Sequence, residues 1–170
     1  ANPKSTTGRL DIFTRLITEY GTEYDEIDYS YSGKLYLEII PQSFSIKLKK
    51  NICLNQVRFF EGLDENIKKK LKISVSIKKG KVSAYRAKKI TSSINLNKIN
   101  YYLKEKYWEE IVPKSDSFII EKDEFYILRS KESIVVPENN AAELEPFKDS
   151  FGNFRVHYAG FFDPGFGLLK

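Results

Sequence analysis

The sequence predicts an all-β fold, and three of its features lead to that expectation. Several short segments alternate apolar and polar residues, which is the period of a strand with one buried face. These segments are rich in β-branched and aromatic residues, and turn residues separate them. Signals for long helices are few. Together these features are typical of a β-sandwich or a distorted β-barrel.

The segments predicted to be strands are residues 35–40, 44–48, 73–77, 82–85, 118–120, 124–128 and 133–136. The turn sequence K-K-G-K at residues 78–81 is expected to join the third and fourth of them into a hairpin. Pro137 is expected to end the last one.

Three segments have weak helical signals. Residues 64–71 begin with acidic residues, which stabilise a helix N-terminus. Residues 101–111 are predicted to form a second helix, which Pro113 would end. Residues 138–144 are expected to add one turn.

The composition excludes several classes of protein. The chain has 170 residues, of which 41% are hydrophobic, so it can offset the entropy of ordering and is not a disordered tail. No apolar run approaches the roughly 18 to 20 residues of a membrane-spanning helix. The length is typical of one domain or two small ones. The first residues have no apolar core, so we expect no secretory signal peptide and a cytoplasmic location.

Cysteine and histidine each occur once, as Cys53 and His157. A single cysteine excludes an intramolecular disulfide. One residue of each type also cannot form the cysteine and histidine set of a structural zinc site or of a zinc-dependent deaminase. We therefore expect no zinc. There is no methionine, even at position 1, and we expect the chain to be an interior piece of a longer protein.

The basic charge is concentrated in one segment. The chain has 28 basic and 23 acidic residues, for a net charge of +5, and ten of the basic residues lie between Lys68 and Lys89 without an acid. This segment is either a patch that binds polyanions or a solvated hairpin whose lysines prevent edge-to-edge pairing. No nucleic-acid motif accompanies the lysines, so nucleic acid is not expected as a partner. The sequence leaves the role of residues 68–89 open.

Residues 2–10, N-P-K-S-T-T-G-R-L, have the composition of an anion-binding loop. Ser5 and Thr6 supply hydroxyl groups, and Lys4 and Arg9 supply positive charge at either end. The segment is not a Walker A loop, because the G-x-x-x-x-G-K pattern is absent. The alternative is an ordinary polar loop.

Glu38 lies within the predicted strand 35–40. If Leu35, Leu37 and Ile39 face one side, Glu38 faces the other, between Tyr36 and Ile40. Such apolar neighbours favour proton uptake by a carboxylate, which suits a general acid–base. The alternative is an edge-strand glutamate that points into water.

Residues 157–167, H-Y-A-G-F-F-D-P-G-F-G, describe a tight hairpin with an open backbone. The main chain at Ala159 and Gly160 suits recognition of a base edge, and Asp163 suits a sugar hydroxyl or a water molecule. The alternative is a structural turn built on the D-P-G sequence.

Three segments in order, residues 3–10, 33–38 (G-K-L-Y-L-E) and 54–59 (L-N-Q-V-R-F), resemble motifs of the dCTP deaminase branch of the dUTPase-like superfamily. The family's phosphate-binding P-R-S-S-x-x-R loop matches Lys4, Ser5, Thr6 and Arg9, with lysine in place of its first arginine. Its catalytic glutamate, in a V-L-E strand, matches Glu38. A later family strand contains a glutamine, which Gln56 matches.

The hairpin at residues 157–167 resembles the family's A-x-x-I-D-P-G-W segment, which normally lies between the loop and the glutamate strand. Its late position implies a second, partial copy of the unit. In the first copy residues 24–33 stand in its place, keeping Asp28 but lacking Pro-Gly, with Glu26 where a basic residue is expected. This resembles tandem bacterial dCTP deaminases. We therefore expect a dUTPase-like distorted barrel (β-clip) in two partial units, residues 1–62 and 116–170, joined by residues 63–115.

The resemblance implies hydrolytic deamination of dCTP to dUTP and ammonia without zinc. Glu38 would move the protons, Ser5 would orient water, and Arg9 would stabilise charge. Lys4, Thr6, Asp28, Gln56, Ala159, Gly160 and Asp163 would bind substrate, and Mg²⁺ would accompany the triphosphate. The resemblance also implies a homo-oligomer, most simply a trimer. The alternatives are a dUTP pyrophosphohydrolase or bifunctional enzyme, in which Asp28 or Asp163 activates water, and a non-catalytic nucleotide-binding module.

Overall fold

The computed structural model describes residues 1–59, 70–90, 92–145 and 160–168. This part of the chain is built from short strands and two four-residue helices. In chain order the elements are β1 (Asn2–Pro3), α1 (Ser5–Gly8), β2 (Ile12–Thr18), β3 (Leu35–Pro41), β4 (Ile46–Lys47), β5 (Asn55–Gln56), β6 (Ala84–Ala87), β7 (Ile94–Asn95), α2 (Lys104–Tyr107), β8 (Trp108–Ile111), β9 (Tyr126–Leu128), β10 (Ala142–Glu143) and β11 (Phe161–Phe162).

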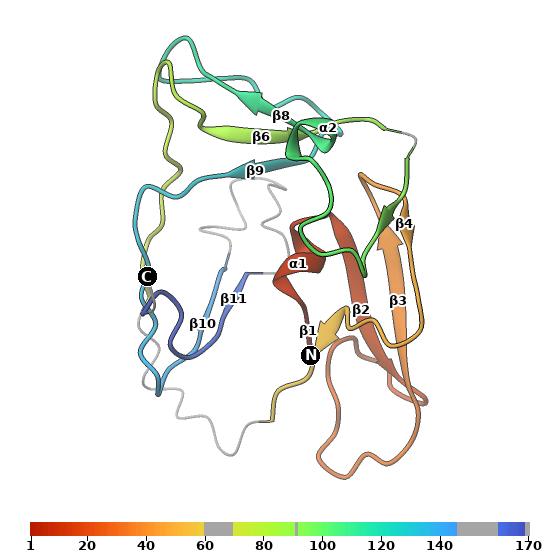
Figure 1. Cartoon of the computed structure of the whole chain (residues 1–170). Helices are drawn as coiled ribbons and strands as arrows, with labels where there is room; N and C mark the ends of the chain where they lie inside the picture. Colours follow the sequence, from red (N-terminus) through yellow and green to blue (C-terminus); the bar gives the residue numbers. More distant parts are fainter. Residues whose placement is uncertain (60–69, 91, 146–159, 169–170) are drawn as a thin grey trace.

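The longest strands, β2 and β3, form an antiparallel hairpin, drawn in red and orange in Figure 1. Side chains alternate between its two faces, as in any strand. Ile12, Thr14 and Leu16 lie on the buried face. Arg15 lies on the opposite face, which is partly exposed and carries Glu38 from β3.

β1 and β5 pair antiparallel beneath the buried face of this hairpin, with Pro3 opposite Asn55. The Thr14 hydroxyl is hydrogen-bonded to the side-chain oxygen of Asn55, which ties β2 to β5. The buried Thr7 of α1 donates a hydrogen bond to the carbonyl oxygen of Leu54 at 3.0 Å. α1 is therefore held on the same side of β2 as β5.

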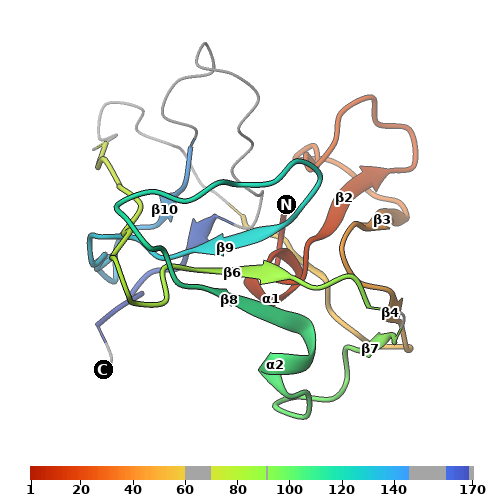
Figure 2. The ribbon, with the colours of Figure 1, turned by 90° about the horizontal axis from the view of Figure 1, so that it is seen from above.

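A three-stranded antiparallel sheet, with strand order β8–β6–β9, forms a separate layer (Figure 2). Arg86 of β6 lies opposite Glu109 of β8, and their side chains form an ion pair of 2.5 Å. Opposite charges at such facing positions stabilise the pairing of the two strands.

An aromatic cluster connects this sheet to the N-terminal part. Phe44, from the segment between β3 and β4, is buried and meets the rings of Tyr107 and Trp108 edge to face, with centroids 5.9 and 5.4 Å apart. Trp108 also lies 6.0 Å from the ring of Phe125, just before β9. β4 and β7 pair in parallel beside the cluster, with Ile46 opposite Ile94.

The C-terminal part contains the β10–β11 hairpin and a turn that packs on residues 133–137. The backbone N–H of Val136, which is buried, donates to the carbonyl oxygen of Phe166 at 2.9 Å. Gly167 has a φ of +80°, and a Cβ there would lie 2.5 Å from the carbonyl oxygen of Ile134. Only glycine fits this close approach without displacing the backbone.

The all-β prediction is confirmed. Predicted strand 35–40 matches β3, and predicted strands 44–48 and 124–128 contain β4 and β9. Within the described ranges the strands form five small sheets, and none of these closes into a barrel. No helix among the described residues is long and apolar enough to cross a membrane.

Several element predictions are wrong. Residues 73–77 make only a single bridge, Val75 to Ser130, and the turn at residues 78–81 leads into β6 without forming the predicted hairpin. Residues 118–120 and 133–136 belong to no strand. The predicted helix 101–111 is one turn, α2, followed by β8, because residues 108–111 pair with β6. Residues 138–144 form a turn and then β10.

Most of the predicted helix at residues 64–71 lies outside the described residues. His157 also lies outside them. The division into units 1–62, 63–115 and 116–170 remains a prediction.

Candidate functional site

Three of the predicted phosphate-binding side chains, those of Ser5, Thr6 and Arg9, are exposed on one turn of helix. The backbone N–H and the Nε of Arg9 both donate to the carbonyl oxygen of Ser5, at 3.0 and 3.3 Å. Residues four apart on a helix lie on the same side. The turn therefore presents a hydroxyl and a cation together, where the sequence predicted a loop.

Backbone hydrogen bonds between β1 and β5 hold the chain immediately before this turn in place. The N–H of Lys4 donates to the carbonyl oxygen of Leu54 at 2.8 Å, directly after β1. Gln56, one of the predicted substrate-binding residues, lies half-buried on β5 opposite Asn2. The structure thus places Gln56 on the strand that supports the exposed turn.

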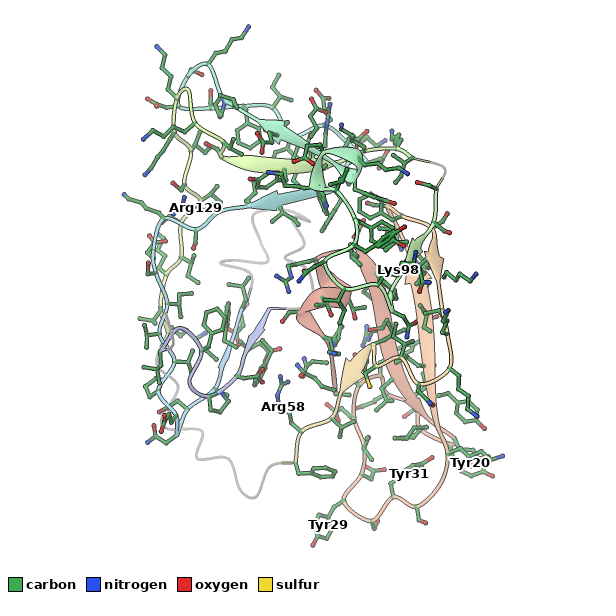
Figure 3. The ribbon with its side chains drawn as sticks, in the orientation of Figure 1. Tyr20, Tyr29, Tyr31, Arg58, Lys98 and Arg129 are labelled. Carbon is green, nitrogen blue, oxygen red and sulfur yellow. The ribbon has the colours of Figure 1, made fainter. Side chains whose placement is uncertain are left out.

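Arg58 joins this region to the β10–β11 hairpin (Figure 3). Its guanidinium donates to the side-chain oxygen of Asn2 at 2.9 Å and pairs with the carboxylate of Asp163 at 3.3 Å. It also lies over the ring of Phe161. Asp163 is therefore held near β1, although its own side chain is 69% exposed.

The other predicted substrate-binding residues are more scattered. The carbonyl oxygen of Gly160 accepts a hydrogen bond of 2.6 Å from the N–H of Leu144, and a Cβ on Gly160 would lie 2.5 Å from the Cβ of Leu144. The absence of a side chain at Gly160 therefore allows its backbone to pass close to Leu144, just after β10. Asp28 is exposed in the loop between β2 and β3. Ala159 lies outside the described residues.

Glu38 lies half-buried in the middle of β3, directly opposite Arg15 on β2. Its strand neighbours Tyr36 and Ile40 are 48% and 41% exposed, so within this chain they desolvate the carboxylate only in part. Glu38 faces away from Asn55, and so away from α1, because side chains alternate along the strands. The hydrogen bonds of the described residues join neither Ser5 nor Arg9 to it.

Two charged residues of this region, Arg15 opposite Glu38 and Asp25 beside Arg15, were not singled out from the sequence. Arg15 lies on the same face of the β2–β3 hairpin, and its Nε is 2.5 Å from the carboxylate of Asp25 in the following loop. The alternation of residues 12–18 would have indicated a strand with Arg15 on its outer face. Nothing in the local pattern indicated Asp25, because its partner is set by the path of the loop.

The surface hollows and the possible metal-ligating side chains of the described residues do not indicate a second functional site. Two shallow hollows on the described surface lie beside residues 41–46 with Ile90, and beside residues 82–85 with 127–129. Neither is lined by a predicted site residue. No group of three or more histidine, cysteine, aspartate or glutamate side chains within the described ranges has the arrangement of a metal site. Cys53 is exposed.

Two family models match the chain and together span it. The N-terminal domain of 2'-deoxycytidine 5'-triphosphate deaminase matches residues 1–63, and the C-terminal domain of the same family matches residues 46–170. No match was found among curated proteins.

The fold is also similar to a solved structure, the 2'-deoxycytidine 5'-triphosphate deaminase from Agrobacterium tumefaciens, with a TM-score of 0.88 and 39% sequence identity. The similarity covers 98% of this chain and 57% of that one, so the chain spans little more than half the length of this relative. The family resemblance drawn from residues 3–10, 33–38 and 54–59 is confirmed, and the chain belongs to the 2'-deoxycytidine 5'-triphosphate deaminase family.

Proposed function

We propose that the protein containing this chain deaminates dCTP hydrolytically, to dUTP and ammonia. The observation that carries the proposal is the match of both domain models of this family, in order, over residues 1–63 and 46–170. The exposed turn with Ser5 and Arg9 supports it, because a triphosphate requires hydroxyl donors and positive charge on one side.

Deamination at C4 of cytosine requires a base to activate water and an acid to protonate the departing ammonia. Glu38 performs both steps in this proposal, taking a proton from water and passing it to the base and then to the amino group. Ser5 orients the water. Arg9, with Lys4 and Thr6, neutralises the phosphates and the charge that develops during attack.

The placement of these groups supports a site shared between copies of the protein. Ser5 and Arg9 lie on one side of the β2–β3 hairpin and Glu38 on the other, so one copy does not present them to a single ligand. A homo-oligomer, and in this proposal a trimer, brings Glu38 of one copy to the exposed turn of another. Gln56, Asp28, Ala159, Gly160 and Asp163 are proposed to contact substrate in that assembly.

The reaction is proposed to need no zinc, because a single cysteine and a single histidine cannot form the ligand set of the zinc deaminases. Mg²⁺ enters with the triphosphate as part of the substrate. We further propose a cytoplasmic location, since nothing in the cysteine content calls for an oxidising compartment.

Product analysis tests this function. The purified protein is incubated with dCTP and Mg²⁺, with and without a zinc-selective chelator, and ammonia, dUTP and pyrophosphate are measured. We expect equal amounts of ammonia and dUTP, unaffected by the chelator. Release of pyrophosphate from dUTP would instead favour the pyrophosphohydrolase or a bifunctional enzyme, with the exposed Asp28 or Asp163 as the residue that activates water. Binding without any product would favour a non-catalytic module.

A further inference from the structure

The guanidinium of Arg58 contacts three groups at once. One of its terminal nitrogens, Nη1, donates a hydrogen bond of 2.9 Å to the side-chain oxygen of Asn2, and the other, Nη2, lies 3.3 Å from Oδ1 of Asp163. The group also lies over the ring of Phe161. Only 17% of the Arg58 side chain is exposed. Because the guanidinium is planar and rigid, contacts with separate nitrogens and with a ring hold it in one orientation.

The first of these contacts fixes Arg58 beside the exposed turn of α1. Asn2 belongs to β1, where it lies opposite Gln56, and it precedes Ser5 by three residues. Three residues of extended chain span at most about 11 Å. Two views at right angles both place the β10–β11 hairpin next to β1 and α1 (Figures 1 and 2). Asp163 is therefore held close to the approach to the predicted phosphate-binding residues.

The backbone of Asp163 is fixed separately, by the turn that follows β11. Its carbonyl oxygen accepts a hydrogen bond of 3.0 Å from the N–H of Phe166, and the N–H of Gly165 donates to the carbonyl oxygen of the buried Val136 at 3.1 Å. These contacts do not involve the carboxylate. Within the described ranges the carboxylate forms its ion pair with Arg58. Arg58 therefore sets the direction in which the carboxylate points.

The carboxylate of Asp163 keeps capacity for a further hydrogen bond. Its two oxygens offer about four lone-pair positions, and Arg58 contacts Oδ1. The side chain is 69% exposed, so the other positions face water. A deoxynucleoside triphosphate has one free sugar hydroxyl, at the 3' carbon, which can donate to a carboxylate. A hydrogen bond to such a charged acceptor is stronger than one between neutral groups.

We infer that Arg58 is a positioning residue for the substrate. It holds the Asp163 carboxylate where this group accepts the 3'-hydroxyl of the deoxyribose while the α1 turn binds the phosphates. The inference rests on the proposed function and deepens it, because it names the residue that brings the C-terminal hairpin to the nucleotide. Arg58 touches Asn2, Phe161 and Asp163, and it acts on the nucleotide only through Asp163.

The experiment compares two nucleotides that differ only in the 3'-hydroxyl. Isothermal titration calorimetry measures how the whole protein binds dUTP and 2',3'-dideoxyuridine triphosphate, neither of which can be deaminated. We expect the wild-type protein to bind dUTP about tenfold more tightly or better, since it alone donates to the carboxylate. In Arg58→Gln this ratio should fall to about threefold or less, because the carboxylate is no longer aimed. Asp163→Ala should bring the ratio close to one.

Asn2→Ala is a second variant that changes less of the structure. It keeps the backbone pairing of β1 with β5 and removes only the hydrogen bond that ties Arg58 to β1. We expect the ratio to fall by about threefold here. Arg129→Gln, at an exposed arginine after β9, is the matched control and should keep the wild-type ratio. In Arg58→Gln/Asp163→Ala the ratio should equal that of Asp163→Ala, because both substitutions act on one contact.

A purely structural arginine would lower stability without changing the preference for the sugar hydroxyl. A folded Arg58→Gln protein with the wild-type ratio would therefore overturn the inference, and circular dichroism establishes whether it is folded. If that variant does not fold, a folded Asn2→Ala protein with the wild-type ratio would overturn it. A wild-type ratio near one would do the same. Absence of ammonia release from dCTP would refute the proposed deamination, whereas the binding ratios do not depend on turnover.

Discussion

The guanidinium of Arg58 and the carboxylate of Asp163 lie 3.3 Å apart, although 105 positions separate them in the chain. Arg58 is the more buried partner, 17% exposed against 69% for Asp163. It also donates to Asn2 and lies over Phe161. One side chain therefore connects β1, which precedes the exposed turn of α1, with the C-terminal hairpin.

We expect Arg58→Ala to lower the free energy of unfolding by about 1 to 3 kcal/mol, because it removes the packing on the half-buried Phe161 and the hydrogen bond to the half-buried Asn2. Asp163→Asn should change it little, since an ion pair with an exposed member contributes little. Urea denaturation of both variants measures the difference. Arg129→Ala, at an exposed arginine near the end of β9, is the matched control. Equal effects of the Arg58 and Arg129 substitutions would contradict this prediction.

Glu38→Gln should reduce kcat for dCTP by about 10²- to 10⁴-fold, the usual effect of losing a general acid–base. Glutamine keeps the shape of the side chain but cannot exchange the proton. Nucleotide affinity should change little, because the proposed phosphate contacts lie on α1 and not on β3. Ammonia release and isothermal titration measure the two quantities, with Glu121→Gln at an exposed position as control. Near-normal ammonia release would make Glu38 a structural residue and favour Asp28 or Asp163.

Ser5→Ala and Arg9→Gln should each raise the KM for dCTP by about tenfold or more, through loss of a hydrogen bond to a charged ligand. Thr7→Val, in the same turn, loses a buried hydrogen bond to Leu54 and should lower stability while leaving KM unchanged. Steady-state kinetics and thermal denaturation separate the two effects. A crystal soaked with dCTP should show phosphate density beside Ser5. Residues 145–152 stand in the place of this loop in the sequence of the expected second unit, so density beside Lys148 would reverse the assignment of the two units.

The hydrogen bonds of two carboxylates, Glu124 and Glu132, make the stability of the folded protein depend on pH. The N–H of Ser74 donates to Glu132 at 2.7 Å, and this hydrogen bond lowers the pKa of Glu132 below its ordinary value of 4.5. The hydrogen bond from Lys89, at 2.8 Å, lowers the pKa of Glu124 in the same direction. Both contributions are complete above the ordinary value and are lost as pH falls through the lowered values.

We therefore expect the melting temperature of the wild-type protein to fall as pH decreases below about 4.5, the unfolded value. In Glu124→Gln/Glu132→Gln that decrease should be smaller, because neither site then binds a proton on unfolding. Differential scanning calorimetry between pH 6 and pH 3 measures the slopes. Parallel slopes for the two proteins would show that these hydrogen bonds do not affect stability.

Gly167→Ala should destabilise the protein much more than Gly80→Ala. Both glycines have a positive φ, so both substitutions introduce backbone strain of about 1 kcal/mol. Only at Gly167 does the added Cβ also meet backbone, at 2.5 Å from the oxygen of Ile134, whereas nothing lies within 4 Å at Gly80. Thermal denaturation ranks the two, and equal losses would mean that the turn shifts to accommodate the methyl group.

The sequence predicted strands correctly where local alternation and burial agree, as in β3. The sequence-based prediction was wrong where contacts with distant parts of the chain determine the secondary structure. Trp108 to Ile111 continue a helical pattern but pair with β6. The well-alternating residues 73–77 form a single bridge, Val75 with Ser130, and no strand. β2 was missed because its buried face includes two threonines, which weaken the apolar signal.

The candidate site likewise has residues that the local sequence predicts and residues that only the tertiary structure brings together. Ser5, Thr6 and Arg9 are close in sequence and are together in the structure. Arg15 and Asp25 depend on strand register and on the loop path, which no local pattern specifies. Glu38 and the α1 turn lie on opposite faces of the β2–β3 hairpin. This arrangement follows from the contact of Thr14 with Asn55, which no local sequence pattern predicts.

Trp108 is the only tryptophan of the chain, and it lies between Phe44 from the N-terminal part and Phe125 beside the three-stranded sheet. Its fluorescence is therefore a label-free reporter of whether these two parts are docked. Among the described residues the most exposed tyrosines are Tyr20 and Tyr29, which project from the loop between β2 and β3 and are already in contact with water in the folded protein (Figure 3). A change of tryptophan emission during unfolding therefore reports the separation of the two parts, whereas a change confined to that loop leaves it unaltered.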